Sequence, residues 1–404
     1  MTVRLQARFL DRATPPHIAT LILVAGLSAL TLNMFLPSLP RMTEHFGTEY
    51  RLMQLSVALY LAVNAVMQIF VGPLSDRFGR RPVLLWGVGL FVLATVGCIF
   101  ASTIEVFLAF RMAQAVVVVG LVLSRAVVRD LYGQDEAASM IGYVTMGMAL
   151  VPMVGPAIGG LLDQLFGWQA SFWLLALLGV ATLWLVARDM GETATSRPAS
   201  LRAQFAQYPE LFASRRFWGY CFASAFSSGA FFVYLGGAPY VGTVVFGLTP
   251  AVLGLYFGAP ALGYVLGNFI SGRYSVRYGI NRMIFAGALV TCIGLALALG
   301  LFHAGIKTAA VFFGAMTFVG FGNGMVLPNA TAGMLSVRPH LAGSASGLGG
   351  AIMLGAGAAL SAGTGTVLTP ENGAFTSIWM MLVTSLMALG SILYTVRRAR
   401  QIGA

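Results

Sequence analysis

The chain has 404 residues, of which 58% are hydrophobic and only 9% are charged. Soluble domains carry roughly 25% charged residues, so this composition, with a mean hydropathy of +0.84, excludes an ordinary soluble fold and indicates many membrane spans. A net charge of +11 would suggest nucleic-acid binding in a soluble protein. Here the basic residues lie in short clusters between apolar stretches, which argues against a nucleic-acid partner.

The first half of the chain contains six apolar stretches, each long enough to cross a bilayer as a helix. Helices are expected because every backbone polar group in lipid needs a partner within the protein. The stretches lie near residues 18–39, 52–74, 82–102, 105–129, 138–163 and 168–188. No cleavage pattern follows the basic N-terminal residues, so we expect the first helix to be retained. Residues 1–188 are predicted to form one bundle.

A polar segment, residues 189–216, follows, and it contains several charged residues with Pro198 and Pro209. We interpret it as a linker, on the cytoplasmic side. Six further apolar stretches then predict a second bundle over residues 217–404. They lie near residues 217–243, 249–275, 282–303, 308–331, 341–366 and 373–395. The sequence therefore predicts an all-α membrane protein with twelve transmembrane helices in two six-helix bundles.

The distribution of basic residues predicts the orientation in the membrane. An even number of spans places both termini on the same side. With the N-terminus inside, only Arg41, Arg51 and Lys307 lie outside, Arg111 lies within a helix, and every other Lys and Arg is cytoplasmic. The positive-inside rule therefore predicts cytoplasmic termini in a bacterial inner membrane. A basic surface that binds anionic lipid would produce the same bias.

A short repeat relates the two halves. The sequence Gly72-Pro-Leu-Ser-Asp-Arg-Phe-Gly79 ends the second apolar stretch, and Gly272-Arg-Tyr-Ser-Val-Arg-Tyr-Gly279 ends the eighth, 200 residues later. The repeat predicts two pseudo-symmetric bundles related by an axis along the membrane normal, which can rock about a central site.

The first copy continues to Arg81 and matches the signature G-x-L-x-D-R-x-G-R-R at every defined position. The chain therefore resembles the major facilitator superfamily. That resemblance implies a loop that acts as a conformational latch between the bundles, and the predicted latch residues are Gly72, Asp76, Arg77, Gly79, Arg80 and Arg81, with Arg129 and Asp130 as partners. Alternatively, these charges only anchor a turn and fix the topology. Val276 replaces Asp76 in the second copy, so a latch would be asymmetric.

The fifth stretch carries small residues and prolines, which allow close helix packing and bending. Its GP-x-x-GG core resembles the motif typical of drug:proton antiporters within the superfamily. The residues concerned are Gly142, Pro152, Gly155, Pro156, Gly159 and Gly160. The resemblance implies a seal or hinge; ordinary close packing of membrane helices is the alternative.

Arg111 in the fourth stretch is the one clearly intramembrane charge, and a charge there costs at least about 2.5 kcal/mol on insertion scales. With Gln114 it resembles the superfamily pattern R-x-x-Q-G, which is usually linked to proton coupling, although Ala115 replaces the glycine. We expect Arg111 to face the interior and to act in coupling or substrate binding. The alternative is that its side chain extends to the outer interface.

The segments 32–40 and 125–132 narrow the resemblance to the bicyclomycin and chloramphenicol resistance (Bcr/CflA) exporters. That family commonly has an acidic residue where this chain has Asn33, and no Asp or Glu lies deep within any apolar stretch. Proton coupling is thus implied by the resemblance and weakened by the residues, unless Asp130 or Asp76 carries the proton. A pocket with Arg111 and no carboxylate should favour neutral or weakly anionic cargo over cations.

Polar and aromatic side chains on otherwise apolar helices are the candidates for the substrate cavity, although each could instead serve packing. They are Tyr60, Asn64, Gln68, Phe226, Phe231, Tyr234, Tyr256, Tyr264 and Asn323. The four histidines and three cysteines show no metal-ligand or disulfide spacing. No cofactor is expected.

The sequence favours a monomeric secondary transporter that exports hydrophobic small molecules such as antibiotics. No phosphate-binding loop for ATP is found, so the expected energy source is the proton gradient. An uptake or exchange carrier for a small neutral or anionic metabolite is the alternative, because the same fold supports it. An enzyme lacks support, because no nucleophile has a plausible base.

Overall fold

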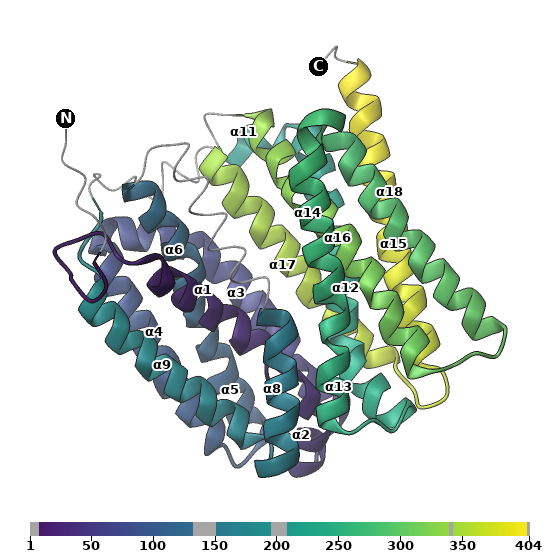
Figure 1. Ribbon diagram of the computed structural model, residues 1–404, viewed down its shortest axis with the longest axis horizontal. Helices are drawn as coiled ribbons and strands as arrows, with labels where there is room; N and C mark the ends of the chain where they lie inside the picture. The colour runs from purple at the N-terminus through teal and green to yellow at the C-terminus, as the bar shows by residue number, and fades with distance from the viewer. Residues whose placement is uncertain (1–7, 132–150, 195–207, 339–341, 402–404) are drawn as a thin grey trace.

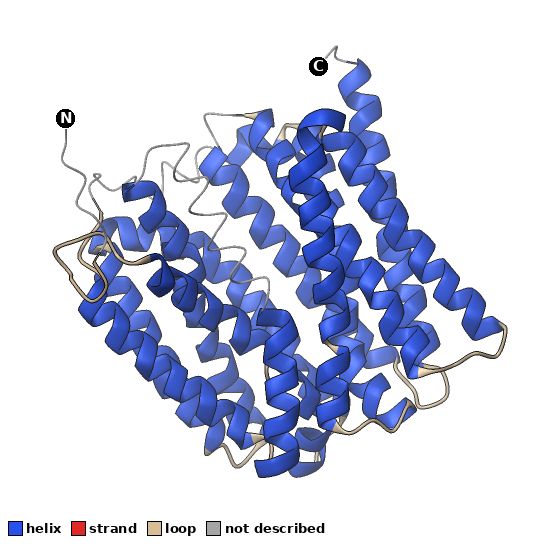
Figure 2. Ribbon diagram, viewed as in Figure 1, coloured by secondary structure: helices blue, strands red, loops and turns tan. Residues whose placement is uncertain are grey.

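A computed structural model describes residues 8–131, 151–194, 208–338 and 342–401. The described residues form helices joined by short loops, without a strand among them (Figure 2). Eleven of these helices are long and apolar enough to span a membrane. The fifth predicted span is described only from Val151 onward, and Gly142 lies outside the described residues.

The first bundle contains five of these eleven spans, two of them built from shorter helices, together with α8. In chain order its elements are α1 (Ile18–Asn33), η1 (Leu36–Ser38), α2 (Leu39–His45), α3 (Tyr50–Phe78), α4 (Arg80–Ile99), α5 (Ile104–Ala113), η2 (Gln114–Val117), α6 (Val118–Leu131), α8 (Val151–Phe166) and α9 (Gln169–Asp189).

The second bundle contains the other six spans. Its elements are α12 (Arg215–Tyr240), η3 (Val241–Val245), α13 (Pro250–Tyr256), α14 (Gly258–Tyr278), α15 (Ile280–His303), α16 (Ala309–Val337), α17 (Ala342–Val367) and α18 (Gly373–Gln401), and the short α11 (Tyr208–Phe212) precedes it. Both chain ends lie at one end of the molecule, here called the terminal end (Figure 1). The opposite end is called the distal end. The all-α fold with two bundles is confirmed.

Local sequence signals explain where several helices begin. The hydroxyls of Thr103, Ser214, Thr249 and Thr308 each accept a hydrogen bond from the backbone N–H three residues later, at the start of α5, α12, α13 and α16. These N-caps satisfy backbone donors that a helix leaves unpaired.

The repeated motif is helical, where the sequence analysis expected a loop. Helix α3 continues through Gly72 to Phe78, and α14 continues likewise to Tyr278. Only Gly79 and Gly279 form the turns, with φ of 95° and 83°, a region that residues with a Cβ rarely adopt. The apolar stretch ends at the membrane surface, but backbone hydrogen bonding continues until these glycines.

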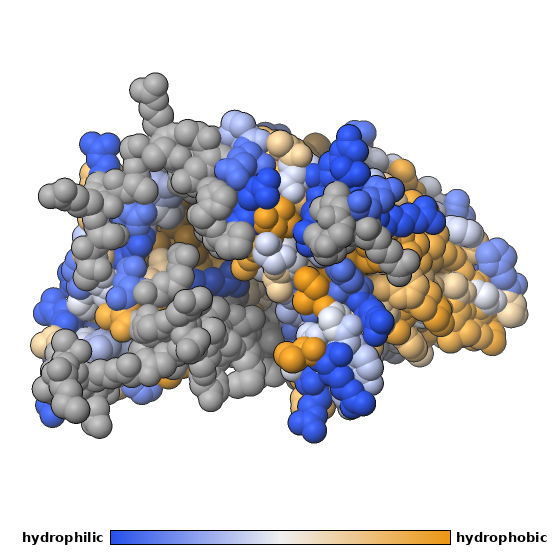
Figure 3. Space-filling model, turned by 90° about the horizontal axis from the view of Figure 1, so that it is seen from above, coloured by the Kyte–Doolittle hydropathy of each residue, from blue (hydrophilic) through white to orange (hydrophobic). Residues whose placement is uncertain are grey.

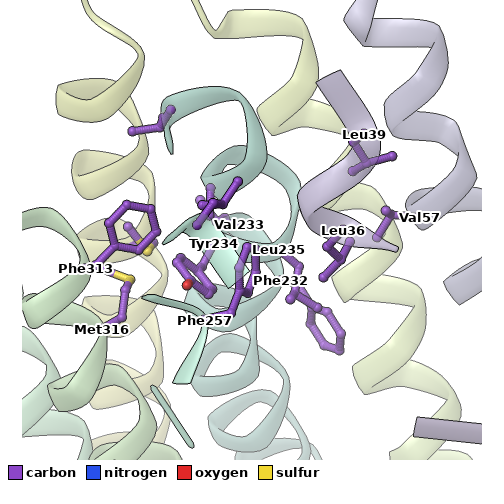
Figure 4. Close-up of a cluster of buried hydrophobic side chains, with 14 of the residues drawn as sticks. Leu36, Leu39, Val57, Phe232, Val233, Tyr234, Leu235, Phe257, Phe313 and Met316 are labelled. Carbon is purple, nitrogen blue, oxygen red and sulfur yellow. The ribbon is translucent and has the colours of Figure 1, made fainter. Parts of the chain in front are cut away.

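The two bundles pack together at the distal end and diverge toward the terminal end (Figure 1). Helix α3 lies along α17, and α8 packs against α13 and α14. One large hydrophobic cluster joins residues of both bundles at this end. Leu36, Leu39 and Val57 of the first bundle lie there near Phe232 and Leu235 of the second (Figure 4). The two bundles are therefore joined at the distal end.

Viewed from the terminal end, the molecule shows hydrophilic residues on this face and apolar residues along a flank (Figure 3). A polar end surface beside an apolar flank is expected where a helical bundle meets the membrane surface.

Candidate transport site

Arg111 ends the last turn of α5 and is completely buried inside the first bundle. Its Nη2 donates to the carbonyl of Thr31 at 2.8 Å, and its Nε donates to the carbonyl of Ser56 at 3.2 Å. The remaining nitrogen, Nη1, donates to Oε1 of Gln114 at 2.8 Å. Helices α1 and α3 and the short η2 therefore hold the guanidinium by backbone and amide oxygens.

Two aromatic rings complete this enclosure. The Cζ atom of Arg111 lies 4.2 Å from the ring centroids of both Phe35 and Tyr60, within the range for cation–π attraction. Both rings are buried. We call Arg111, Gln114, Phe35 and Tyr60, with the Thr31 and Ser56 carbonyls, the arginine cage.

The cage extends away from Arg111 through hydrogen bonds. Gln114 donates from Nε2 to the hydroxyl of Thr95 at 2.8 Å, and that hydroxyl donates to the carbonyl of Phe91 at 2.6 Å. All these partners are neutral, and no described carboxylate forms an ion pair with Arg111. The charge is therefore stabilised by dipoles and π-faces, and these hydrogen bonds fix the orientation of both the Gln114 amide and the Arg111 guanidinium.

This geometry agrees with an Arg111 side chain that faces the interior and excludes the alternative. Its side chain does not extend to the outer interface, because it is fully buried. It also lines no open pocket in this conformation. The predicted neighbour Asn33 is buried as well, but its Nδ2 donates to the carbonyl of Ala29 in its own helix at 2.8 Å. Of the three predicted coupling residues, only Arg111 and Gln114 are in direct contact.

Several predicted cavity residues belong to the packed interior. Tyr60 is in the arginine cage, and Tyr234 is fully buried in the hydrophobic cluster, 5.1 Å from Phe257 between ring centroids. Tyr256 stacks on Phe313 at 4.7 Å. Aromatic packing explains these positions, since rings supply large buried area.

The polar members of the set form short hydrogen bonds. Gln68 donates to Asn64 Oδ1 at 3.2 Å on α3, and Ser227 donates to Asn323 Oδ1 at 2.7 Å between α12 and α16. The partly buried members, which keep some exposed surface, are Gln68, Phe226, Phe231, Tyr256 and Tyr264. These five are the better candidates for contact with a substrate in this conformation.

The junction between α3 and α4 contains a network of charges centred on Arg80. Arg80 forms ion pairs with Asp76 at 2.5 Å and with Asp130 of α6 at 3.0 Å. It also donates to the hydroxyl of Ser75. The predicted partnership with Asp130 is present, and it lies within the first bundle.

The other predicted latch residues take different places. Arg77 stacks over the ring of Phe78, and Arg81 donates to the carbonyl of Ala187 at 3.2 Å. A Cβ at Gly72 would meet no atom within 4 Å, so this glycine forms no tight turn. Arg129 lies in α6, but its side chain is outside what the structure describes.

Glu192 is a part of this junction that the sequence analysis missed. Its carboxylate accepts from the backbone N–H of Arg80 at 2.8 Å and of Arg81 at 3.3 Å, at the N-terminus of α4. A carboxylate there satisfies unpaired donors and interacts favourably with the helix dipole. The linker therefore begins by fastening the end of α9 to α4. The contact depends on the packing of α9 against α4, which the sequence pattern does not reveal.

The second copy of the repeat lacks this network. Ile280 stands at the position of Arg80, and Val276, at the position of Asp76, is 98% exposed. Arg277 stacks on Tyr278 as Arg77 does on Phe78. The aromatic contact and the glycine turn are thus shared by both bundles, while the charge network is confined to the first.

We expect Arg80→Ala to lower the free energy of unfolding by about 2–3 kcal/mol, because hydrogen bonds to charged groups are worth about 1.5–3 kcal/mol each. Arg77→Ala, a matched control on the same surface, should cost less than about 1 kcal/mol. Thermal denaturation of the purified variants measures both values. Equal unfolding temperatures for the two variants would contradict the central role of Arg80.

The small residues of α8 bring backbones into contact on two sides. A Cβ on Gly159 would collide with the carbonyl of Met34 in the first bundle, and a Cβ on Gly160 would collide with the carbonyl of Pro250 in the second. A Cβ on Gly254 of α13 would in turn collide with the carbonyl of Pro156. Gly155 packs beside Leu30, and the side chain of Pro152 is not described.

A second contact closes the distal end at α3. Gln54 donates to the carbonyl and hydroxyl of Ser361 in α17 at 3.2 and 2.7 Å, and Tyr50 donates to the carbonyl of Gly236 at 3.0 Å. Together with the glycine contacts of α8 and α13, these bonds form what we call the distal gate. It consists mainly of backbone approaches and neutral polar groups.

Comparison with known sequences identifies the family. A profile of the Major Facilitator Superfamily matches residues 21–362. The chain belongs to this superfamily. It is therefore a multi-pass membrane transporter and not an enzyme.

Relatives confirm the resemblance to the Bcr/CflA family. The chain is 32% identical to a chloramphenicol resistance protein of Pseudomonas aeruginosa, over 92% of this chain and 89% of that protein. It is 28% identical to multidrug resistance protein D of Escherichia coli, over 87% and 89% of the two chains.

Solved structures of other superfamily members share the fold. A bacterial homologue of the lysosomal transporter Spinster, in an inward-facing and occupied conformation, matches with a TM-score of 0.72 at 16% identity, over 95% of this chain and 96% of that one. A D-xylose–proton symporter also matches with a TM-score of 0.72 at 16% identity, over 94% and 96%.

Proposed function

We propose that this superfamily member is a secondary exporter of hydrophobic small molecules, including antibiotics, across the bacterial inner membrane. The observation that carries the proposal is the closed distal gate with bundles that diverge at the other end, in a chain whose relatives are named as drug resistance proteins. With the termini in the cytoplasm, as the basic residues predict, the end at which the bundles diverge faces inward. Rocking of the bundles about a central site, with the distal gate opening in turn, then gives alternating access.

Residues 1–188 and 217–404 are the proposed moving bodies, and residues 189–216 are the proposed linker. The proposed latch is the Arg80 network, and the proposed site lies between the bundles. We propose that the energy source is the proton gradient, that no cofactor is required, and that the functional unit is a monomer in the lipid bilayer.

Direction and coupling are tested together in proteoliposomes. A pH gradient, acidic on the side of the distal gate, should drive chloramphenicol accumulation on that side. Addition of the drug should in turn cause protons to move from the distal side to the terminal side. Asp130→Asn should weaken the coupled flux. Transport that ignores the pH gradient in the unmodified protein would exclude antiport, and uptake of a small metabolite instead of drug efflux would support the alternative carrier.

The arginine cage makes a prediction about cargo. A buried positive charge without a described carboxylate partner disfavours cations nearby, because the low dielectric of the interior strengthens repulsion. We expect cells that carry the protein to export neutral chloramphenicol and to show no measurable export of ethidium. Efflux of the two compounds, compared with cells that lack the protein, checks this; strong ethidium export would contradict it.

A further inference from the structure

A buried carboxylate lies at the distal gate. Asp163 is in the last turn of α8, and its side chain is fully buried. Its Oδ1 lies 3.2 Å from Nη1 of Arg41 in α2, whose side chain is half-exposed. The same Nη1 donates to the backbone carbonyl of Asp163 at 2.6 Å. One guanidinium nitrogen therefore serves both the carboxylate and the end of the helix.

The second carboxylate oxygen is unpaired. Among the described residues, Oδ2 of Asp163 has no hydrogen-bond partner, and neither has the hydroxyl of Ser38, which lies beside the carboxyl group. An ionised carboxylate only accepts hydrogen bonds, whereas a protonated one can also donate. An ionised Oδ2 could accept from the Ser38 hydroxyl, and a protonated Oδ2 could donate to the oxygen of that hydroxyl.

The surroundings of Asp163 contain few other charges. Helices α1 and α13 and the short η1 carry no Asp, Glu, Lys, Arg or His, and Tyr256 at the end of α13 is their one titratable side chain. In α9 and α14 the charged residues stand toward the far, terminal end. Helix α2 supplies Arg41 and, further along, Glu44 and His45. Arg41 is thus the charge that faces the carboxyl group.

The distal gate lies next to the helix end that carries this carboxyl group. Gly160, one turn before Asp163, meets the carbonyl of Pro250 at the start of α13. The η1 segment that ends at Ser38 also packs against α13. Separation of α8 from α13 would therefore part the second bundle from the two segments that carry Ser38 and Asp163, and water could enter between them from the distal side.

We propose that Asp163 is a proton-binding site whose occupancy is linked to closure of the distal gate. When the gate is open, the carboxylate is hydrated and paired with Arg41. When the gate closes and water leaves, one proton binds Oδ2, because burial disfavours the charged carboxylate, and the new O–H donates to the hydroxyl oxygen of Ser38. The closed form then binds the proton more tightly than the open form, so by linkage a falling pH on the distal side favours closure, and the effect disappears as the pH rises.

Asp163 thereby supplies the acid that is absent at Asn33, but at the gate instead of in the centre. The proposal deepens the proposed function, because it rests on a transporter whose distal gate opens. It requires no substrate, so it can be tested apart from drug transport.

The test is a distance measurement across the gate. Spin labels are attached at Thr48, at the distal end of the first bundle, and at Val244, at the distal end of the second, with the three buried cysteines replaced by alanine. Double electron–electron resonance spectroscopy then records the distribution of distances between the two labels from about pH 8 to about pH 5, a range in which perturbed carboxyl groups titrate. In otherwise unmodified protein, we expect acid to shift the population toward the short distance.

Asp163→Asn should abolish that shift and leave the short distance dominant at both pH values, since the amide resembles the neutral acid. Glu44→Gln, which removes an exposed carboxylate from the neighbouring α2, should preserve the shift. A pH response that persists in Asp163→Asn would overturn the proposal, as would its absence in the parent protein. If the pH-dependent shift in distance is present but the protein does not exchange protons for drug, the proposed drug:proton antiport is contradicted and the role of Asp163 at the gate is not.

Discussion

Arg111→Ala is expected to abolish transport and to lower the free energy of unfolding by about 4 kcal/mol. The substitution leaves a cavity between two aromatic rings and removes the donor from three buried acceptors, the carbonyls of Thr31 and Ser56 and the amide oxygen of Gln114. Each buried acceptor without a partner costs about 1–3 kcal/mol. Thermal denaturation and drug efflux measure the two effects.

Two controls separate charge from geometry in the arginine cage. Arg111→Lys keeps the charge but cannot reach three acceptors with a planar fork, so we expect intermediate stability and little transport. Arg51→Ala removes an exposed arginine whose ion-pair partner among the described residues is Glu49, and it should change the stability by less than about 1 kcal/mol. Equal unfolding temperatures for Arg111→Ala and Arg51→Ala would contradict a structural role for the arginine cage.

Gly160→Ala is expected to reduce the transport rate at least about tenfold. A tenfold loss corresponds to a destabilisation of the closed state by about 1.4 kcal/mol. The added methyl group occupies the position of the Pro250 carbonyl oxygen, so α8 and α13 must separate and the distal gate is held open. The overpacking of a close contact typically costs about 1–3 kcal/mol. Initial rates in proteoliposomes measure the loss, and cysteine accessibility from the distal side measures the opening.

Gly300→Ala is the matched control, because a Cβ at Gly300 in α15 would meet no atom within 4 Å. It should transport at the unmodified rate. Gly254→Ala introduces the reciprocal collision, with Pro156, and should reproduce the defect of Gly160→Ala. If Gly160→Ala transports normally, the gate does not depend on this approach.

The sequence was sufficient for the spans and the repeat because apolar length and a motif of fixed spacing are local signals. The predicted stretches near 82–102 and 282–303 correspond to α4 and α15 within a few residues. The extension of α3 through its polar end was not predicted, because hydropathy reports the membrane boundary and not the end of backbone hydrogen bonding. Gly79 marked the true end.

The candidate site was predicted less completely because its partners are not local. Arg111 and Gln114 stood out as polar residues in an apolar helix, but two of the three acceptors of Arg111 are backbone carbonyls, which no residue type reveals. The burial of Asp163, at the end of a predicted span, depends on the approach of α2 and α13. Such features follow from tertiary packing, and only the helix arrangement exposes them.

The glycine contacts between α8 and α13 have a consequence for the range of compounds that one carrier can accept. The seal is made by main chain against main chain, so nothing in it recognises a particular molecule. A transported compound needs no functional group that binds to this seal, and its chemistry can neither strengthen nor weaken the contact between α8 and α13. Selection between substrates must then occur before the bundles rock. A compound that inserts between α8 and α13 and separates them would inhibit the transport of every substrate equally.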